Sequence, residues 1–121
     1  MIKSFTDLEV YQESFQLSIE IDQILKTFPN DERYLLIDQM KRCSRAIPAI
    51  IAEGYAKRES IKEFQKFLRD ALGEANEMLN HLAFSKARRF ISEAKSNDLI
   101  ERYSILGKKL TNLKNNWRKF D

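Results

Sequence analysis

The stretch Arg42-Cys-Ser-Arg-Ala-Ile-Pro-Ala-Ile-Ile-Ala-Glu-Gly-Tyr55 places Pro48 deep inside an otherwise helical pattern. A proline inside a helix removes one backbone hydrogen bond and its ring clashes with the preceding turn, at a cost of roughly 3 kcal/mol. The pattern therefore predicts one long helix, kinked at Pro48 and held by packing on both sides. Either the kink sets the curvature of a contact between protomers, or the proline is accommodated and has no role beyond local packing. Helical spacing continues through the proline at Met40, Cys43, Ile47, Ile50, Ile51 and Gly54.

A first helix is predicted before this stretch. Thr6-Asp-Leu-Glu9 has the form of a capping box, in which two side chains bond backbone N–H groups at a helix start. The apolar pattern continues to Phe28 and is stopped by Pro29. The proline-containing helix is then expected to begin after Asn30 as its cap and to end near Gly54 or shortly beyond.

Two further helices are predicted after it. Ser60-Ile-Lys-Glu63 is a second capping box, so the third helix is expected to start at Ile61, and the fourth starts after either Ser92 or Ser96. Four helices with short connections predict an all-α fold, an antiparallel up-down-up-down four-helix bundle, with residues 1–121 as a single domain. The apolar residues that recur three or four apart are Ile61, Phe64, Leu68, Ala71, Ala75, Met78 and Leu82, then Leu99, Tyr103, Leu106, Leu110, Leu113 and Trp117.

Composition agrees with this fold class. The 121 residues are 43% hydrophobic and 32% charged, with only three Gly and two Pro, which leaves little turn chemistry for an all-β fold. The single cysteine, Cys43, excludes an internal disulfide and a cysteine-based metal cluster, and is expected to be a small buried hydrophobe. No apolar run has the length of a membrane span and no signal-peptide core is visible, so we expect a cytoplasmic protein.

Sequence signatures of catalysis are absent. There is no glycine-rich phosphate loop, no nucleophile elbow and no cysteine–histidine pair with plausible local spacing. A di-iron bundle needs inward-facing Glu-x-x-His motifs on two helices, whereas the single His81 follows Glu77 by four residues. Helical geometry places Glu74, Glu77 and His81 opposite the apolar side of the third helix, where we expect solvated groups. No catalytic residue, metal or cofactor is predicted.

The first helix carries more apolar surface than one bundle core needs. One cluster contains Leu8, Tyr11, Phe15 and Ile19, and the other contains Val10, Leu17, Ile21, Ile24 and Phe28. One cluster can face the core while the other needs a second partner. We predict a homo-oligomer in which the second cluster contacts the small residues Ala49 and Ala52 of a neighbour. Alternatively, the loops and termini of the chain itself cover this cluster.

Basic residues suggest a binding surface. The formal net charge is +3, with an acidic first helix and a basic fourth. A polar face of the third helix contains Lys62, Lys66, Arg69, Gly73, Asn76 and Asn80, and a second group contains Lys41, Arg42 and Arg45. Both are predicted to contact nucleic-acid phosphates and bases. They could equally be solvated surface with intrahelical ion pairs, such as Lys66 with Asp70, and Arg42 and Arg45 could instead form ion pairs between protomers.

The Pro48 stretch closely resembles the signature of bacterial four-helix-bundle proteins encoded in intervening sequences of 23S rRNA genes, also called S23 ribosomal protein-like. The motif residues are Ile47, Pro48, Ala52, Glu53 and Gly54. This family is distantly similar to the accessory variability proteins of diversity-generating retroelements. The resemblance implies a five-fold ring, with ribosomal RNA or a reverse transcriptase and its RNA template as partners.

The chain also departs from the family's pattern. Ala46 and Ile50 replace a serine and an asparagine, so a role that depends on that asparagine is in doubt. A glycine that often follows the third helix is absent from Ala87-Arg-Arg-Phe-Ile91. The function predicted from all these features is that of a non-enzymatic oligomer that binds structured RNA or another nucleic acid. The alternative is a ring-shaped scaffold for protein interactions without nucleic acid, and an enzyme has the least support.

Overall fold

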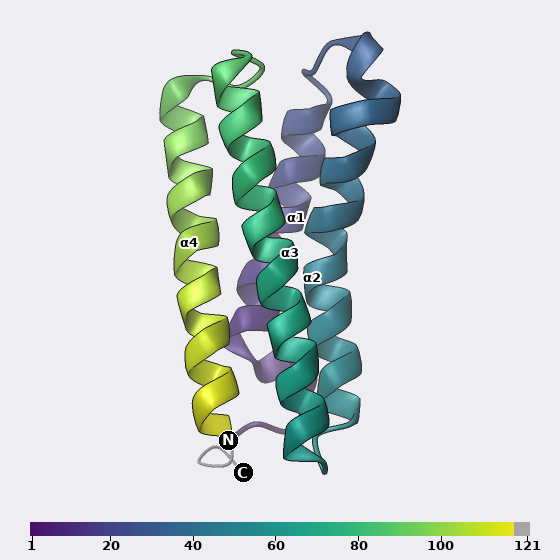
Figure 1. Ribbon diagram of the computed structural model, residues 1–121, viewed down its shortest axis with the longest axis vertical. Coiled ribbons are helices and arrows are strands. Elements are labelled where there is room, and N and C mark those ends of the chain that lie inside the picture. The colour runs from purple at the N-terminus through teal and green to yellow at the C-terminus, as the bar shows by residue number, and fades with distance from the viewer. Residues whose placement is uncertain (118–121) are drawn as a thin grey trace.

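The helices run antiparallel, and each packs beside the next one along the chain. The computed structural model describes residues 1–117, in which the long α-helices are α1 (Glu9–Leu25), α2 (Asp38–Ala56), α3 (Ile61–Ala87) and α4 (Glu93–Asn116). Figure 1 shows the up-down-up-down order, in which α4 returns to lie beside α1. The predicted all-α four-helix bundle is therefore confirmed. α2 continues through the buried Pro48 as expected, and the kink there stays a prediction.

The start of α1 differs from the predicted one. A 3₁₀ turn (Phe5–Asp7) precedes the helix, and Ser4 is its cap. The Asp7 carboxylate accepts the Ser4 N–H at 3.1 Å, so the capping box spans Ser4 and Asp7. The box predicted from Thr6 to Glu9 is wrong, because Leu8 is extended at the junction and offers no side-chain cap to α1.

The connection between α1 and α2 is less regular than predicted. α1 ends at Leu25, and a 3₁₀ turn (Asn30–Glu32) and a π-helical turn (Arg33–Ile37) separate it from α2. Asn30 does not cap α2 with its side chain, so that prediction is wrong. Phe28 is nevertheless buried, and its ring packs at a tilt against that of Phe90 in the α3–α4 connection, with 5.3 Å between the ring centroids.

The starts of α3 and α4 are fixed by serine caps. Ser60 Oγ accepts the Glu63 N–H at 3.2 Å, as predicted. Of the two alternatives for α4, Ser92 is the cap, since its Oγ accepts the Lys95 N–H at 3.2 Å, while Ser96 is buried within the helix. Local side chain–backbone bonds of this kind can be inferred from short sequence patterns.

The core lies between the helices and includes residues from each of them. α2 and α3 approach closely at Gly54, where a side chain would meet the Phe67 Cβ at 2.5 Å. Gly54 therefore serves close packing and does not end the helix through a left-handed backbone. The large side chains with less than 2% exposure include Ile21, Met40, Ile47, Ile51, Phe64, Leu68, Met78, Leu82, Leu99, Tyr103 and Leu106.

Candidate functional site

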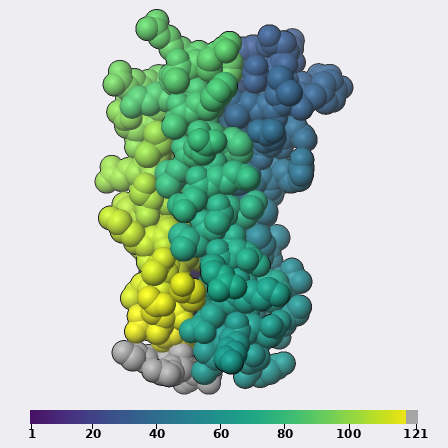
Figure 2. Space-filling view, viewed as in Figure 1, coloured from purple at the N-terminus to yellow at the C-terminus, as the bar shows by residue number. Residues whose placement is uncertain are grey.

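The polar face predicted on the third helix is exposed along α3. We call Lys62, Lys66, Arg69, Gly73, Asn76 and Asn80 the α3 polar face, and each of them is exposed. Figure 2 shows α3 along the centre of one side of the molecule, with α2 and α4 beside it. Among residues 1–117, no ion pair involves Lys62, Lys66 or Arg69, so the alternative pairing of Lys66 with Asp70 is not found. These cations are available to an external anion.

A groove between α3 and α4 borders this face. It has a volume of about 390 Å³ and is lined by Asn76 of the α3 polar face and by Lys108 of α4. Lys108 is exposed. The groove therefore brings an amide and a further cation to one edge of the polar face.

The second predicted basic group has partners within the chain. Arg45 Nη2 lies 2.9 Å from Asp22 Oδ2 on α1, and Arg42 Nη2 lies 3.5 Å from Asp38 Oδ2. Asp22 satisfies Arg45 without a neighbouring protomer. Lys41 is exposed, and no ion pair joins it to another residue of the described chain. This group is consequently a weaker candidate for phosphate binding than the α3 polar face.

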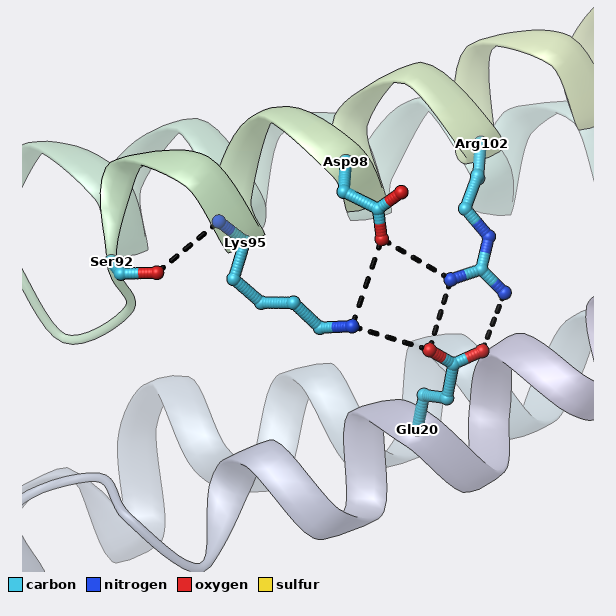
Figure 3. Close-up of polar contacts among 5 residues, drawn as sticks. All are labelled: Glu20, Ser92, Lys95, Asp98 and Arg102. Carbon is cyan, nitrogen blue, oxygen red and sulfur yellow. Dashed lines mark hydrogen bonds and ion pairs between the residues drawn. The ribbon is translucent and has the colours of Figure 1, made fainter.

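Three cations of the basic fourth helix, Lys95, Arg102 and Lys109, form ion pairs with the acidic first helix. Glu20 of α1 accepts bonds from Arg102, at 2.9 Å from Nη1, and from Lys95 at 3.3 Å, and Asp98 completes the cluster in Figure 3. The hydrogen bond from Arg102 lowers the pKa of Glu20 below its ordinary value, and burial partly opposes this. Near the other end, Lys109 bridges Glu9 and Glu13. Sequence reasoning missed these pairs, although the opposite charges of the two helices were visible.

An exposed apolar groove lies between α1 and α2, and we call it the α1–α2 groove. It has a volume of about 480 Å³. Phe15 and Ile19 keep 47% and 42% of their surface exposed there. Large exposed apolar side chains that adjoin one another are a feature of interaction surfaces. Its apolar lining consists of Phe5, Tyr11, Phe15, Ile19, Pro48, Ala49 and Ala52.

The groove reverses the predicted roles of the two apolar clusters of α1. The prediction that Val10, Leu17, Ile21 and Phe28 contact a neighbour is wrong, because they are buried in the chain's own core, at 5% exposure or less, and Ile24 is half-buried. α1 packs against both α2 and α4, so the cluster that contains Val10, Leu17 and Ile21 faces inward. Ala49 is exposed and Ala52 half-buried, and their predicted contact with a neighbour stays a prediction.

A third groove, between α2 and α3, shows that the prediction of a solvated surface at Glu74, Glu77 and His81 is wrong for His81, while Glu77 is exposed as predicted and Glu74 is half-buried. His81 is only 9% exposed, because this side of α3 faces α2. Cys43 is buried beside it, and its thiol donates to the Glu74 carbonyl oxygen at 3.2 Å. Burial raises the pKa of the Cys43 thiol, and the Glu77 and Glu74 carboxyl groups raise it further. Burial lowers the pKa of His81, against an opposing effect of Glu77.

Comparison with known protein families matches residues 6–112 to 23S rRNA-intervening sequence proteins. The chain belongs to this family. The match extends from the first turn into the last part of α4, so it covers the bundle and the Pro48 motif together. The similarity to retroelement accessory proteins stays a prediction.

A solved structure shares the fold of this 23S rRNA-intervening sequence protein. It is a protein of unknown function from the S23 ribosomal protein family of Bacteroides thetaiotaomicron, with 22% sequence identity and a TM-score of 0.78. The alignment covers 88% of this chain and 95% of the other. At this identity the likeness establishes the fold alone. No curated protein matches the chain.

The family motif has a packing role in this protein. Ile47 and Pro48 are buried, and Gly54 allows α2 to approach α3. Ala52 lines the α1–α2 groove, and Glu53 is exposed, 3.8 Å from Lys57. Within residues 1–117, none of the helices has the length and apolar character needed to span a membrane.

Proposed function

We propose that this 23S rRNA-intervening sequence protein is a non-enzymatic, cytoplasmic homo-oligomer that binds structured RNA through the α3 polar face. The observation that carries the proposal is a contrast between the basic residues of α4 and those of the α3 polar face. Lys95, Arg102 and Lys109 of α4 are held by acidic residues of α1. Lys62 and Arg69 of α3, by contrast, have no acidic partner in the described part of the chain. Cations without internal partners can neutralise phosphates at the least electrostatic cost.

The spacing along α3 suits contact with a nucleic-acid backbone. From Lys62 to Asn80 the face extends about 27 Å, at 1.5 Å per residue. Lys62, Lys66 and Arg69 occupy successive turns at one end, where they would contact phosphates. The amides of Asn76 and Asn80 lie toward the other end and can donate to base edges or to ribose hydroxyls. Such binding is mostly electrostatic, so we expect low sequence specificity and a strong dependence on salt.

In this proposal, assembly into an oligomer strengthens the binding of RNA. The α1–α2 groove supplies an apolar contact surface, and the resemblance to the family suggests a five-fold ring. Symmetry would repeat the α3 polar face in each protomer, so a modest charge per chain would produce a stronger total field. The resemblance also suggests the partner, which is ribosomal RNA or a reverse transcriptase with its RNA template.

The test is a triple variant, Lys62→Gln, Lys66→Gln and Arg69→Gln. Its binding to a structured fragment of 23S rRNA is compared with that of the wild type at several salt concentrations. We expect the variant to lose most of its affinity and the salt dependence to become shallower, because up to three phosphate contacts per protomer disappear. Oligomeric mass should not change, since these side chains are exposed and lie away from the α1–α2 groove.

A second triple variant is the control for net charge. Lys3→Gln, Lys26→Gln and Arg33→Gln remove the same number of charges from other exposed positions, and RNA binding should be largely kept. Equal losses in both variants would mean that only total charge matters. If neither the wild type nor the variants bind RNA while the oligomer persists, the α1–α2 groove favours the alternative, a protein-interaction scaffold.

A further inference from the structure

The groove between α2 and α3 gathers three potential metal ligands beside the α3 polar face. Cys43 of α2 and Glu77 and His81 of α3 each offer one ligand atom, and these atoms all lie within 4.8 Å of one another. Cys43 and His81 are buried and Glu77 is exposed, so the cluster lies at the boundary between the core and solvent. The groove has a volume of about 500 Å³ and is lined by Gln39, Arg42, Cys43, Ala46, Glu74, Glu77 and His81.

Local structure explains why these three side chains meet. Glu77 and His81 are four residues apart on α3, so they lie one above the other on the same side of that helix. Cys43 comes from the facing side of α2, between the core residues Met40 and Ile47. Its thiol is held against α3 by the hydrogen bond to the Glu74 carbonyl oxygen at 3.2 Å. The donor set is therefore built from two closely packed helices.

We propose that Cys43, Glu77 and His81 form a Zn²⁺ site, with a fourth position open to water or to the Glu74 carboxylate. Zinc in proteins takes thiolate, imidazole and carboxylate ligands at about 2.0–2.3 Å, which places the ligand atoms of a tetrahedron about 3.3–3.7 Å apart. The ligand atoms of the cluster lie within 4.8 Å of one another, so binding of the ion requires small rotations of these side chains, and the exposed Glu77 is the freest to move. Sulfur and nitrogen donors favour zinc over calcium or magnesium, which prefer sites made of oxygen alone.

The charges around the groove also favour a cation. Glu74 and Glu77 place two carboxyl groups beside the thiol, and a divalent ion would neutralise the charge that these groups concentrate there. Arg42 also lines the groove, and its positive charge opposes the binding of a cation there. Its side chain is 78% exposed and lies 3.5 Å from Asp38, so it can remain in solvent when the ion binds. The bound ion would cross-link α2 to α3, independently of any contact with RNA.

The test uses protein without a histidine tag, because His81 is the single histidine of the chain and a tag would add ligands. Titration with Co²⁺ should give a thiolate-to-cobalt charge-transfer absorption that saturates at one ion per chain. Zn²⁺ should then remove this absorption by displacing the cobalt. Zn²⁺ should also raise the melting temperature of the wild type, since ligands that bind only the folded state stabilise it.

Variants assign the ligands. Glu77→Gln, His81→Gln and Cys43→Ser should each weaken Zn²⁺ binding by about 100-fold or more, and Cys43→Ser should abolish the charge-transfer absorption. Glu101→Gln, an exposed change on α4, is the matched control and should bind like the wild type. Circular dichroism without metal checks that each variant folds, and Glu77→Gln is the safest, because Glu77 is exposed. A wild type without the absorption, or a folded Glu77→Gln with unchanged Zn²⁺ affinity, would overturn the proposal.

Discussion

Arg89 has a left-handed backbone, with φ of 62°, at the end of α3. The Phe90 N–H donates to the Ser85 carbonyl at 2.9 Å, and the Arg89 N–H donates to the Lys86 carbonyl at 3.0 Å. These two bonds form a Schellman motif, which closes a helix and is most often built with glycine. Residues 87–91 contain no glycine, so an arginine occupies the left-handed position of this motif. Arginine there has a steric cost that glycine avoids.

We predict that Arg89→Gly stabilises the protein by roughly 1 kcal/mol, because it relieves the left-handed strain and keeps both backbone bonds. Urea denaturation of the two proteins measures this change. Arg88→Gly is the control, since Arg88 has φ of −80° and glycine gains nothing at that position. An equal loss of stability in both variants would contradict the prediction.

Helix caps have partners that are local in sequence, and two of them were predicted correctly, although those expected at Thr6 and Asn30 were wrong. The caps at Ser60 and Ser92 depend on a backbone N–H three residues away, so a short pattern is sufficient to suggest them. The burial of His81 was not predicted, because it depends on packing against α2, which is distant in sequence. The helical wheel gave its angle on α3 correctly relative to the apolar residues, but the angle does not show how widely a neighbouring helix covers that side.

At the scale of elements, α1 and α4 are joined by ion pairs more than by close packing. Glu20 of α1 forms ion pairs with both Arg102 and Lys95 of α4 (Figure 3). The pKa of Glu20 is lowered in the folded protein, so its charged form stabilises the fold. This contribution is present above the ordinary value of 4.5 and is lost as the pH falls through the lowered pKa.

We predict that Glu20→Gln destabilises the protein by about 1 kcal/mol at pH 7 and that this difference disappears in acid, below the folded-state pKa of Glu20. Urea denaturation of both proteins at a series of pH values measures it. Glu101→Gln, on the exposed side of α4, is the control and should differ little from the wild type at any pH. A destabilisation by Glu20→Gln that persists unchanged in acid would mean that packing, and not charge, holds this contact.

The helices themselves were predictable because apolar periodicity is a local property, but the orientation of α1 was not. Val10, Leu17 and Ile21 lie on one side of α1 and Phe15 and Ile19 on another, and either side is apolar enough to face a core. The choice depends on the simultaneous packing of α1 against α2 and α4. Irregular turns, such as the π-helical turn at Arg33–Ile37, also lack a simple sequence signal.

At the scale of the whole molecule, the α1–α2 groove and the α3 polar face involve different helices. Phe15 and Ile19 lie in the first, and Lys62 and Arg69 belong to the second. Assembly and RNA binding can therefore be altered separately. The family match and the shared fold define the bundle, and the roles of these two surfaces rest on their chemistry.

We predict that Phe15→Ser combined with Ile19→Ser lowers the mass of the particle in solution to that of a monomer. Both side chains are substantially exposed in the single chain, so removing them from a contact between protomers costs affinity while the core is unaffected. Light scattering at low and high salt, with and without RNA, measures the mass. Phe84→Ser is the matched control, because Phe84 is 52% exposed on α3 and does not line the groove. An oligomer that takes up RNA at low salt and releases it at high salt supports both surfaces together, whereas a monomeric wild type would refute the proposed role of the groove.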